Sequence, residues 1–204
     1  MAPRILPIVS AADFTAAVDA ATRGDAVAIC LTDLDGFAQL NEELGVAAGD
    51  AVLGAWTRTL TRSLPRRAIV QRLGGDEFAI ALPGSSLENA VIVMSEISEH
   101  VVAHPVEEIS RAISATFGVA ARPPHAADTR DLIECANVAL MRGKREGGAR
   151  VAIYLEEKMV LKSNYYTRAD LDRLARLAGA TQRTEASLLR EALDDLMSKY
   201  RTQR

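Results

Sequence analysis

The chain has 204 residues, of which 49% are apolar and 25% charged, and its formal net charge is −3. These values are typical of a globular protein with one ordinary domain, or with one domain and a small module. No apolar run approaches the roughly 18–20 residues that a membrane span requires, so no membrane partner is expected. Cys30 and Cys135 lie within apolar segments. This position predicts buried thiols without a disulfide, and favours a cytoplasmic protein.

Apolar periodicity, candidate caps and glycine-containing breaks define the expected elements. In chain order they are a helix capped by Ser10 (11–24), a buried strand (26–33), two helices (33–45 and 47–64), a β-hairpin (68–82), a helix (83–102), a strand (113–122), a helix (129–147) and a last strand (149–154). In the helix over 47–64 the inward residues are Val52, Leu53, Trp56, Leu60 and Leu64. We therefore predict an α+β fold over residues 1–154, with helices packed on a mixed sheet.

Residues 155–204 differ in character and form a predicted second domain. They carry ten Lys or Arg against eight Asp or Glu, whereas the rest of the chain has fourteen against nineteen. A strand is expected over 158–166, followed by a helix that Gly179 ends and a second helix that Thr184 caps. One short strand and two short helices form no sufficient core alone, so this domain is expected to dimerise or to pack on another surface.

Two groups of acids suggest a metal site. Asp33 and Asp35 close the first buried strand, and Asp76 lies at the tip of the hairpin beside Gly74 and Gly75. If that strand lies beside the hairpin, Asp33 and Asp76 converge, and with the carbonyl of Leu34 they would bind Mg²⁺. The alternatives are a solvated turn with incidental acids and, for the Asp-Leu-Asp run, a cap for the following helix.

Asn41 and Asp50 follow the first strand by about one helix. The amide of Asn41 offers donors and an acceptor to a base edge, and the carboxylate of Asp50 accepts from an amino or imino group. Both residues are equally well explained as surface polar groups when they are considered without the carboxylates.

At this point the sequence resembles a known family. Residues 32–53 (TDLDGFAQLNEELGVAAGDAVL), RLGGDEFAI at 72–80, SATFGVA at 114–120 and ANVALMRGKREGGARV at 136–151 are similar to the GGDEF domain of diguanylate cyclases. The resemblance implies a fold related to nucleotide-cyclase and polymerase palms. It also implies a GTP half-site on each chain, two of which join two GTP into cyclic di-GMP and pyrophosphate.

The resemblance also assigns roles to individual residues. Asp33, the Leu34 carbonyl and Asp76 would hold Mg²⁺ (or Mn²⁺), while Glu77 assists the metal or activates the ribose 3′-hydroxyl. The substrate-binding residues would be Asn41 and Asp50 at guanine, Gly74 and Gly75 near the phosphates, and Lys144 at the triphosphate. The reaction is an in-line attack in which positioning and charge neutralisation supply most of the catalysis.

The chain departs from the family pattern at several positions. It has Ala38 where the family has a lysine, Val46 where it has a histidine, and Gly148 where it has an arginine. Losing two cations near a triphosphate is expected to weaken binding or turnover by a few kcal/mol. The product-inhibition motif of the family, Arg-x-x-Asp, would fall on residues 65–68 and is absent, so no feedback by cyclic di-GMP is expected.

The second domain resembles a ribbon-helix-helix DNA-binding domain over about residues 158–200. In that family two chains intertwine, and their paired strands enter the major groove of DNA. The shared dimer core would consist of Leu171, Leu174, Leu177, Leu188, Leu189, Leu193 and Leu196. Phosphate would be bound at the start of the second helix, around Thr184.

The register of the predicted ribbon has two solutions. Alternation places either Lys162 and Asn164 outward, or Leu161, Ser163 and Tyr165. The chemistry of Lys162 and Asn164 suits bases, whereas the spacing of the family favours Ser163 and Tyr165. A dimerisation segment that never touches DNA is the alternative to both, since a charge of +2 is small for a DNA binder.

Three functional hypotheses follow. The first is a dimeric diguanylate cyclase coupled to DNA, which would need a higher oligomer if the short linker at 155–157 keeps the two catalytic faces apart. The second is a catalytically weak transcription regulator that senses GTP or cyclic di-GMP. The third is a non-catalytic dimer scaffold, which the intact acids at positions 33, 76 and 77 disfavour.

Overall fold

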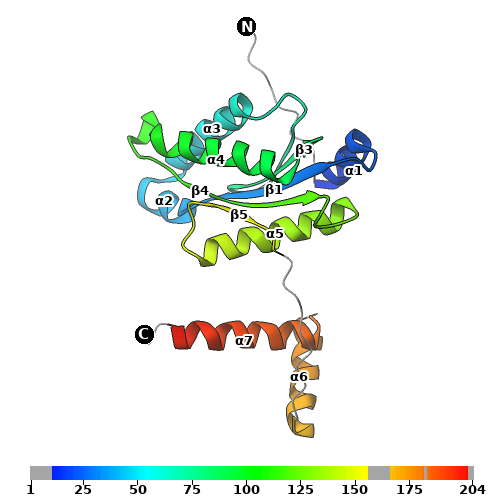
Figure 1. Ribbon diagram of the computed structural model, residues 1–204. Helices are drawn as coiled ribbons and strands as arrows, with labels where there is room; N and C mark the ends of the chain where they lie inside the picture. The colour runs from blue at the N-terminus through cyan, green and yellow to red at the C-terminus, as the bar shows by residue number, and fades with distance from the viewer. Residues whose placement is uncertain (1–10, 156–165, 182, 202–204) are drawn as a thin grey trace. The chain divides into compact units, whose positions relative to one another are not determined.

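Five strands form one mixed sheet in the order β2-β3-β1-β4-β5 in the computed structural model (Figure 1). The structure describes residues 11–155, 166–181 and 183–201. The strands are β1 (Val27–Leu34), β2 (Ile69–Gly74), β3 (Glu77–Pro83), β4 (Ala115–Arg122) and β5 (Val151–Ile153). The helices around the sheet are α1 (Ala11–Thr22), α2 (Phe37–Leu44), α3 (Val46–Ser63), α4 (Leu87–Ala103) and α5 (Thr129–Arg145), with a short 3₁₀ helix at Glu107–Ile109. The α+β class and the mixed sheet are confirmed.

The central strand β1 is antiparallel to both of its neighbours. Asp33 lies opposite Glu77 of β3 on one side and opposite Thr116 of β4 on the other. The last strand, β5, pairs with β4 in the parallel direction. The expected hairpin is present, because β2 and β3 are antiparallel neighbours joined at Gly75 and Asp76. This register brings the end of the first strand beside the hairpin tip.

Helices cover both faces of the sheet, α3 and α4 on one face and α1 and α5 on the other. Figure 1 shows α4 and α5 on opposite sides of the strands. Side chains alternate along β1 between the two cores, with Cys30 facing α3 and α4 and Ile29 facing α1 and α5. Trp56 is fully buried, and its ring lies 5.9 Å from that of Phe117. The prediction of a core aromatic at this position is confirmed.

Helix α5 packs directly against β4, because the strand has a glycine where the helix crosses it. A Cβ atom at Gly118 would lie 2.2 Å from the Ala136 carbonyl oxygen and from the Leu140 backbone nitrogen. Near the end of the helix, a Cβ atom at Gly143 would lie 2.9 Å from a methyl group of Thr116. These two glycines allow the helix to lie on the sheet, and so they set the height of Lys144 above the end of β1.

The chain divides into two compact units, Met1–Glu157 and Lys158–Arg204. In the second unit the structure describes α6 (Arg168–Thr181) and α7 (Glu185–Arg201). The prediction that Gly179 ends the first of these helices was wrong, because α6 continues through it to Thr181. A single glycine in a helix costs only about 1 kcal/mol, which the neighbouring turns offset. The predicted strand is left open, since positions 158–165 lie outside the described residues.

Two further expectations concern the chemistry of the chain. Cys30 is buried, Cys135 is half-buried, and both are free thiols. Within the described ranges, every helix is too short or too polar to cross a membrane.

Candidate functional site

The end of β1 and the tip of the β2–β3 hairpin bring acidic side chains together. Asp33 is the last but one residue of β1 and pairs with Glu77, the first residue of β3. Asp76 precedes Glu77 in the turn, so all three carboxylates belong to one end of the sheet. The Asp33 side chain is 19% exposed, and Glu77 is exposed to solvent. Asp33 and Asp76, which the sequence predicted to converge, do lie together, and their side chains interact.

The pKa of Asp76 is affected by the nearby acids. Partial burial raises the pKa of the Asp76 carboxyl above its ordinary value, and the negative charge of Asp33 and a hydrogen bond with that side chain raise it further. A backbone hydrogen bond of Asp76 and the positive charge of Lys144 act in the opposite direction. Two carboxylates held this close favour a cation between them.

Lys144 already supplies one positive charge. Its Nζ forms an ion pair with Asp33 Oδ1 and lies 3.6 Å from Asp35 Oδ1. The lysine reaches this place from the last turn of α5, and its side chain is 29% exposed. The structure thus brings together Asp33, Asp76 and Lys144, which are separated by up to 111 residues in the sequence.

The hairpin tip is held in shape by an arginine that the sequence analysis did not single out. Arg72 donates from Nε and from Nη2 to the carbonyl oxygen of Gly75, at 2.8 and 2.6 Å. Gly75 has φ +49°, and the strand register shifts between Arg72 and Gly74. A Cβ atom at Gly74 or at Gly75 would meet no atom within 4 Å. The backbone of the tip is therefore open to approach by another group.

Asn41 and Asp50 stand on two consecutive helices that meet at Gly45. Asn41 belongs to α2 and Asp50 to the first turns of α3. The Asn41 side chain occupies the space over Gly49, where a Cβ atom would lie 1.9 Å from Asn41 Oδ1. The glycine before Asp50 therefore makes room for the Asn41 amide, and the two polar groups lie on one α2–α3 surface.

The second acid of the Asp-Leu-Asp run has a role that the sequence analysis missed. The alternative of a helix cap is overturned, because the N-cap residue of α2 is Gly36, which has no side chain to accept a capping hydrogen bond. Asp35 instead accepts hydrogen bonds from Ser114 and Thr116. A Ser-x-Thr pattern at the start of an apolar strand was the available signal, but it becomes informative only once β4 is known to pair with β1.

The donor set suits a hard divalent cation that shares its coordination sphere with a ligand. Among the residues that the structure describes, no group of three or more His, Cys, Asp or Glu side chains is arranged to hold a metal ion by itself. The protein would therefore contribute the carboxylates of Asp33 and Asp76 and a backbone carbonyl. This limited set fits Mg²⁺, which retains water and phosphate oxygens in its coordination sphere.

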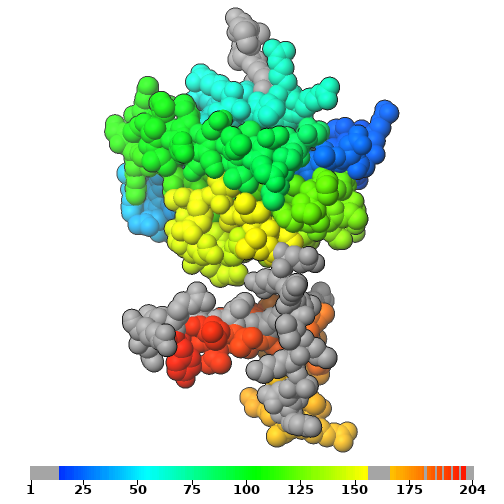
Figure 2. Space-filling model, viewed as in Figure 1, coloured from blue at the N-terminus to red at the C-terminus, as the bar shows by residue number. Residues whose placement is uncertain are grey.

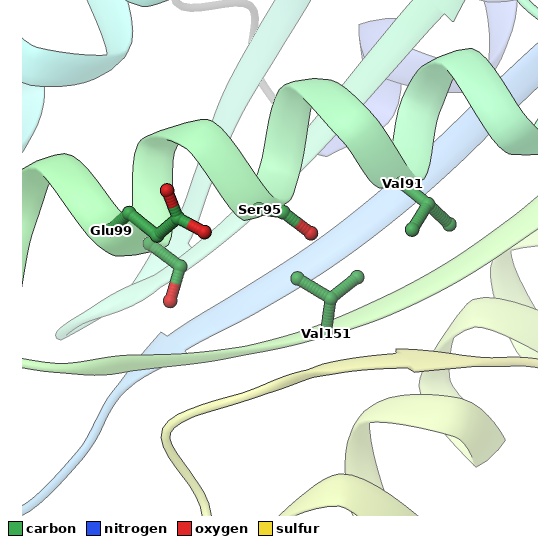
Figure 3. A pocket seen from close by; sticks show the side chains of 5 residues that line it. Val91, Ser95, Glu99 and Val151 are labelled. Atoms are coloured by element: carbon green, nitrogen blue, oxygen red, sulfur yellow. The ribbon is translucent and has the colours of Figure 1, made fainter.

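A shallow groove of about 240 Å³ lies between α4 and β5. These two segments are side by side at the surface, α4 in green and β5 in yellow in Figure 2. The side chains of Val91, Ser95 and Glu99 come from α4, and that of Val151 comes from β5 (Figure 3). Ser98 completes the lining. Because the groove has a single carboxylate and no candidate site residue, the chemistry is expected at the acidic end of β1.

Thr184 is the one predicted DNA-contacting residue that falls within the described part of the chain. Lys162, Ser163, Asn164 and Tyr165 lie outside the described residues. Thr184 directly precedes α7 and is exposed, and its carbonyl oxygen accepts from the Leu188 backbone N–H at 3.1 Å. It therefore stands at the start of the helix, as expected.

Comparisons with known proteins show what the chain is similar to. The family model described as "Diguanylate cyclase, GGDEF domain" matches residues 11–150. Diguanylate cyclase TpbB of Pseudomonas aeruginosa (strain UCBPP-PA14) is 32% identical over 149 residues, which are 71% of this chain and 34% of that protein. A diguanylate cyclase of Vibrio cholerae serotype O1 is 30% identical over 144 residues, 70% of this chain and 45% of that protein. The chain thus spans less than half the length of these two relatives.

Solved structures show the same fold. The crystal structure of the GGDEF domain of TpbB from Pseudomonas aeruginosa has a TM-score of 0.68 at 28% identity and covers 75% of this chain and 100% of that one. The active GGEEF domain of a diguanylate cyclase from Vibrio cholerae has a TM-score of 0.66 at 28% identity, covering 72% of this chain and 94% of that one.

Proposed function

Because the chain belongs to the family of diguanylate cyclase GGDEF domains, we propose that its first unit binds GTP and that two such units condense two GTP into cyclic di-GMP. Two molecules of pyrophosphate leave, one for each phosphodiester bond that forms. The observation that supports this proposal most directly is the pairing of Asp33 with Glu77 across β1 and β3. It brings two acids to one end of the sheet, where Lys144 also forms an ion pair with Asp33, and such a group of charges would suit a metal ion and the phosphates of GTP.

The proposed roles follow from position and chemistry. Asp76 and Glu77 are the catalytic residues, and the exposed Glu77 carboxylate accepts the 3′-hydroxyl proton. The open backbone at Gly74 and Gly75 lets the triphosphate approach, and Lys144 neutralises part of its charge. Mg²⁺ or Mn²⁺, bound by Asp33, Asp76 and the Leu34 carbonyl, would stabilise charge on the phosphates and acidify the hydroxyl.

Guanine recognition is assigned to the α2–α3 surface. The Asn41 amide and the Asp50 carboxylate offer an acceptor–donor pattern that fits the guanine edge. Phe37 and Leu53 are half-buried on the same two helices, and their side chains pack on the core below. They would give the base an apolar floor.

The second unit is proposed as a dimerisation and DNA-binding module of the ribbon-helix-helix type. Both of its helices expose apolar side chains, with relative exposures between 40% and 58% at Leu171, Leu177, Leu189, Leu193 and Leu196. Leaving such side chains in water forgoes the stabilisation of burial, which a second copy of the chain would recover. In this dimer Lys162, Ser163, Asn164 and Tyr165 would face DNA bases, and Thr184 would lie near a phosphate.

A second candidate function is a transcription regulator that senses GTP or cyclic di-GMP with little turnover. Two positions favour it, because Ala38 and Gly148 leave the triphosphate with fewer cations than the family pattern supplies. Val46, where the family has a histidine, is 73% exposed and nonpolar. Binding that depends on the α2–α3 surface would survive these changes, whereas catalysis would be slowed.

One experiment separates the two functions. Purified full-length protein is incubated with GTP and Mg²⁺, and the products are separated by chromatography, with Asp76→Ala and Glu77→Ala as controls. Cyclic di-GMP from the wild type alone supports the cyclase. Nucleotide binding without product supports the sensor, and absence of both excludes a nucleotide site.

DNA binding is tested separately with promoter DNA from upstream of its own gene. A mobility shift that disappears when residues 158–204 are deleted, and that weakens steeply with salt, supports the module. No shift at low salt would leave dimerisation as its role, which sedimentation measures directly.

A further inference from the structure

The Asp35 carboxylate is surrounded by hydrogen-bond donors from two other parts of the first unit. Ser114 Oγ donates to Oδ2 at 2.9 Å, and Thr116 Oγ1 donates to Oδ1 at 2.6 Å. The Ala149 backbone N–H also donates to Oδ2, at 2.9 Å. Both oxygens of Asp35 are thus engaged by neutral groups of the protein. A carboxylate held in this way is a structural anchor, unlike Asp33, which pairs with the Lys144 ammonium group and with the Asp76 side chain.

The segment that Asp35 holds is the loop between α5 and β5. Ala149 has φ +51°, and its N–H is shared between Asp35 and Thr116 Oγ1, the latter at 3.1 Å. The loop begins directly after the last turn of α5, which carries Lys144. Fixing Ala149 therefore fixes the end of the helix from which the Lys144 side chain extends.

Gly148 allows this contact to form. Its φ is +72°, and a Cβ atom there would lie 2.9 Å from Asp35 Oδ1 and 3.2 Å from Thr116 Oγ1. These two atoms are hydrogen-bonded to each other, and the Ala149 N–H donates to Thr116 Oγ1 and to the other carboxylate oxygen, Oδ2, so neither group can move aside without breaking a hydrogen bond. A glycine at this position thus leaves the space that the Asp35 carboxylate fills.

Lys144 lies between the two acids of the Asp-Leu-Asp run. Its Nζ forms an ion pair with Asp33 and stands 3.6 Å from Asp35. The ammonium group thus binds Asp33 closely and is attracted by Asp35 at the longer distance. The two acids therefore differ in their surroundings. Asp33 faces the hairpin carboxylates, whereas Asp35 faces β4 and the segment between α5 and β5.

We propose that Asp35 is a positioning residue, which anchors the α5–β5 loop and so directs Lys144 toward Asp33 and the bound triphosphate. It binds neither the metal nor the nucleotide. The part concerning the triphosphate rests on the proposed function, whereas the anchoring of the loop does not.

The anchoring is tested by amide hydrogen exchange on the full-length protein without nucleotide, comparing wild type, Asp35→Asn and Lys144→Met. Asp35→Asn keeps the shape of the side chain but removes its charge. We expect exchange in residues 146–150 to accelerate about tenfold or more in this variant, as local opening becomes easier, and to stay at the wild-type rate in Lys144→Met. Asp128→Asn, the same change at the N-cap of α5, is the matched control and should leave this loop unchanged.

The positioning role is tested by a double-mutant cycle on GTP affinity. We expect Asp35→Asn and Lys144→Met each to weaken GTP binding about tenfold, the effect of losing one charge-assisted interaction. The double variant should be no weaker than Lys144→Met alone within about twofold, because Asp35 acts only through the lysine. Affinity for Mg²⁺, measured by calorimetry without nucleotide, should fall much less in Asp35→Asn than in Asp33→Asn, because only the second variant loses a proposed ligand.

Each outcome decides one part of the proposal. If amide exchange in the loop is unchanged in Asp35→Asn, the anchoring is overturned. If the effects of Asp35→Asn and Lys144→Met on GTP affinity are additive, the action of Asp35 through Lys144 is overturned. A loss of Mg²⁺ affinity as large as that of Asp33→Asn would make Asp35 a ligand. If the wild type fails to bind GTP, the proposed function fails, while the exchange result still decides the anchoring. Thr116→Val, which removes one donor to the same carboxylate, replaces Asp35→Asn if that variant does not fold.

Discussion

Gly49 lies so close to the side chain of Asn41 that a single added methyl group would reach to 1.9 Å from the amide oxygen. Because position 49 has no side chain, the Asn41 amide can pack directly against α3. The candidate base-reading pair, Asn41 and Asp50, depends on this glycine as much as on its own polar groups.

Replacing Gly49 with alanine is expected to displace the Asn41 amide and to weaken GTP binding about tenfold or more, since a recognition group is then misplaced. Calorimetric titration with GTP and ATP measures this, and discrimination between the two purines should fall. The matched control is Gly54→Ala on the same helix, where the nearest atom, at 3.3 Å, is the end of the flexible Arg58 side chain. Equal losses in both variants would contradict a specific role for position 49.

Gly118→Ala is expected to destabilise the first unit by about 2–4 kcal/mol, because its Cβ atom would meet the backbone of α5 and force the helix away from β4. Thermal or urea unfolding measures the change. Gly179→Ala in α6 serves as the comparison, since a Cβ atom there meets nothing within 4 Å. A loss in Gly118→Ala as small as that in the comparison would mean that α5 does not rest on the strand.

Asp76→Asn is expected to stabilise the metal-free protein near neutral pH. The pKa of Asp76 is raised by partial burial and by Asp33, so the folded state disfavours the ionised carboxylate. This cost is present above the folded pKa and disappears as the pH falls below the ordinary value of 3.8. The amide should raise the melting temperature by about 1–3 °C at neutral pH, a small effect because solvent screens a partly exposed site.

The measurement is a melting curve in chelator at several pH values. The advantage of Asp76→Asn should shrink steadily toward acid pH, and Glu96→Gln, the same charge change on the exposed side of α4, should show no such trend. Adding Mg²⁺ should stabilise the wild type but not Asp76→Asn, because a metal ligand is lost. A variant less stable than the wild type at neutral pH would contradict the repulsion between the two acids.

Ala38→Lys is expected to increase the affinity for GTP about fivefold, by adding a cation near the triphosphate. Ala38 is exposed on α2, so the lysine can be accommodated without repacking. Ala103→Lys on α4 adds the same charge elsewhere and should leave affinity unchanged.

Gly148→Arg should instead weaken GTP binding, because position 148 has a positive φ and the new side chain would collide with Asp35. Improved turnover in Gly148→Arg would show that the loop tolerates the family arginine.

Product feedback is expected to be absent. Residues 65–68 read Pro-Arg-Arg-Ala and lack the Arg-x-x-Asp pattern of the family inhibitory site. Turnover of GTP should therefore be insensitive to added cyclic di-GMP at low micromolar concentration. Inhibition in that range with unchanged GTP affinity would reveal a different regulatory site.

Much of the fold follows from local patterns. The buried strand β1, the hairpin around Gly74 and Gly75, and the amphipathic helix with Trp56 facing inward all rest on periodicity and turn chemistry that act over a few residues. The end of α6 was misjudged at Gly179, because the penalty of one glycine is small beside the hydrogen bonds of a continuing helix.

The amino-acid sequence by itself determined the elements of the first unit, the acidic strand end and hairpin tip, and the family to which they belong. Only the tertiary structure decided that Asp35 anchors a loop while Asp33 faces the hairpin. The physical reason is distance along the chain, because the partners of Asp35 in Ser114, Thr116 and Ala149 are 79, 81 and 114 residues away. Such contacts depend on strand order and register, which arise from packing the whole sheet and not from any local pattern.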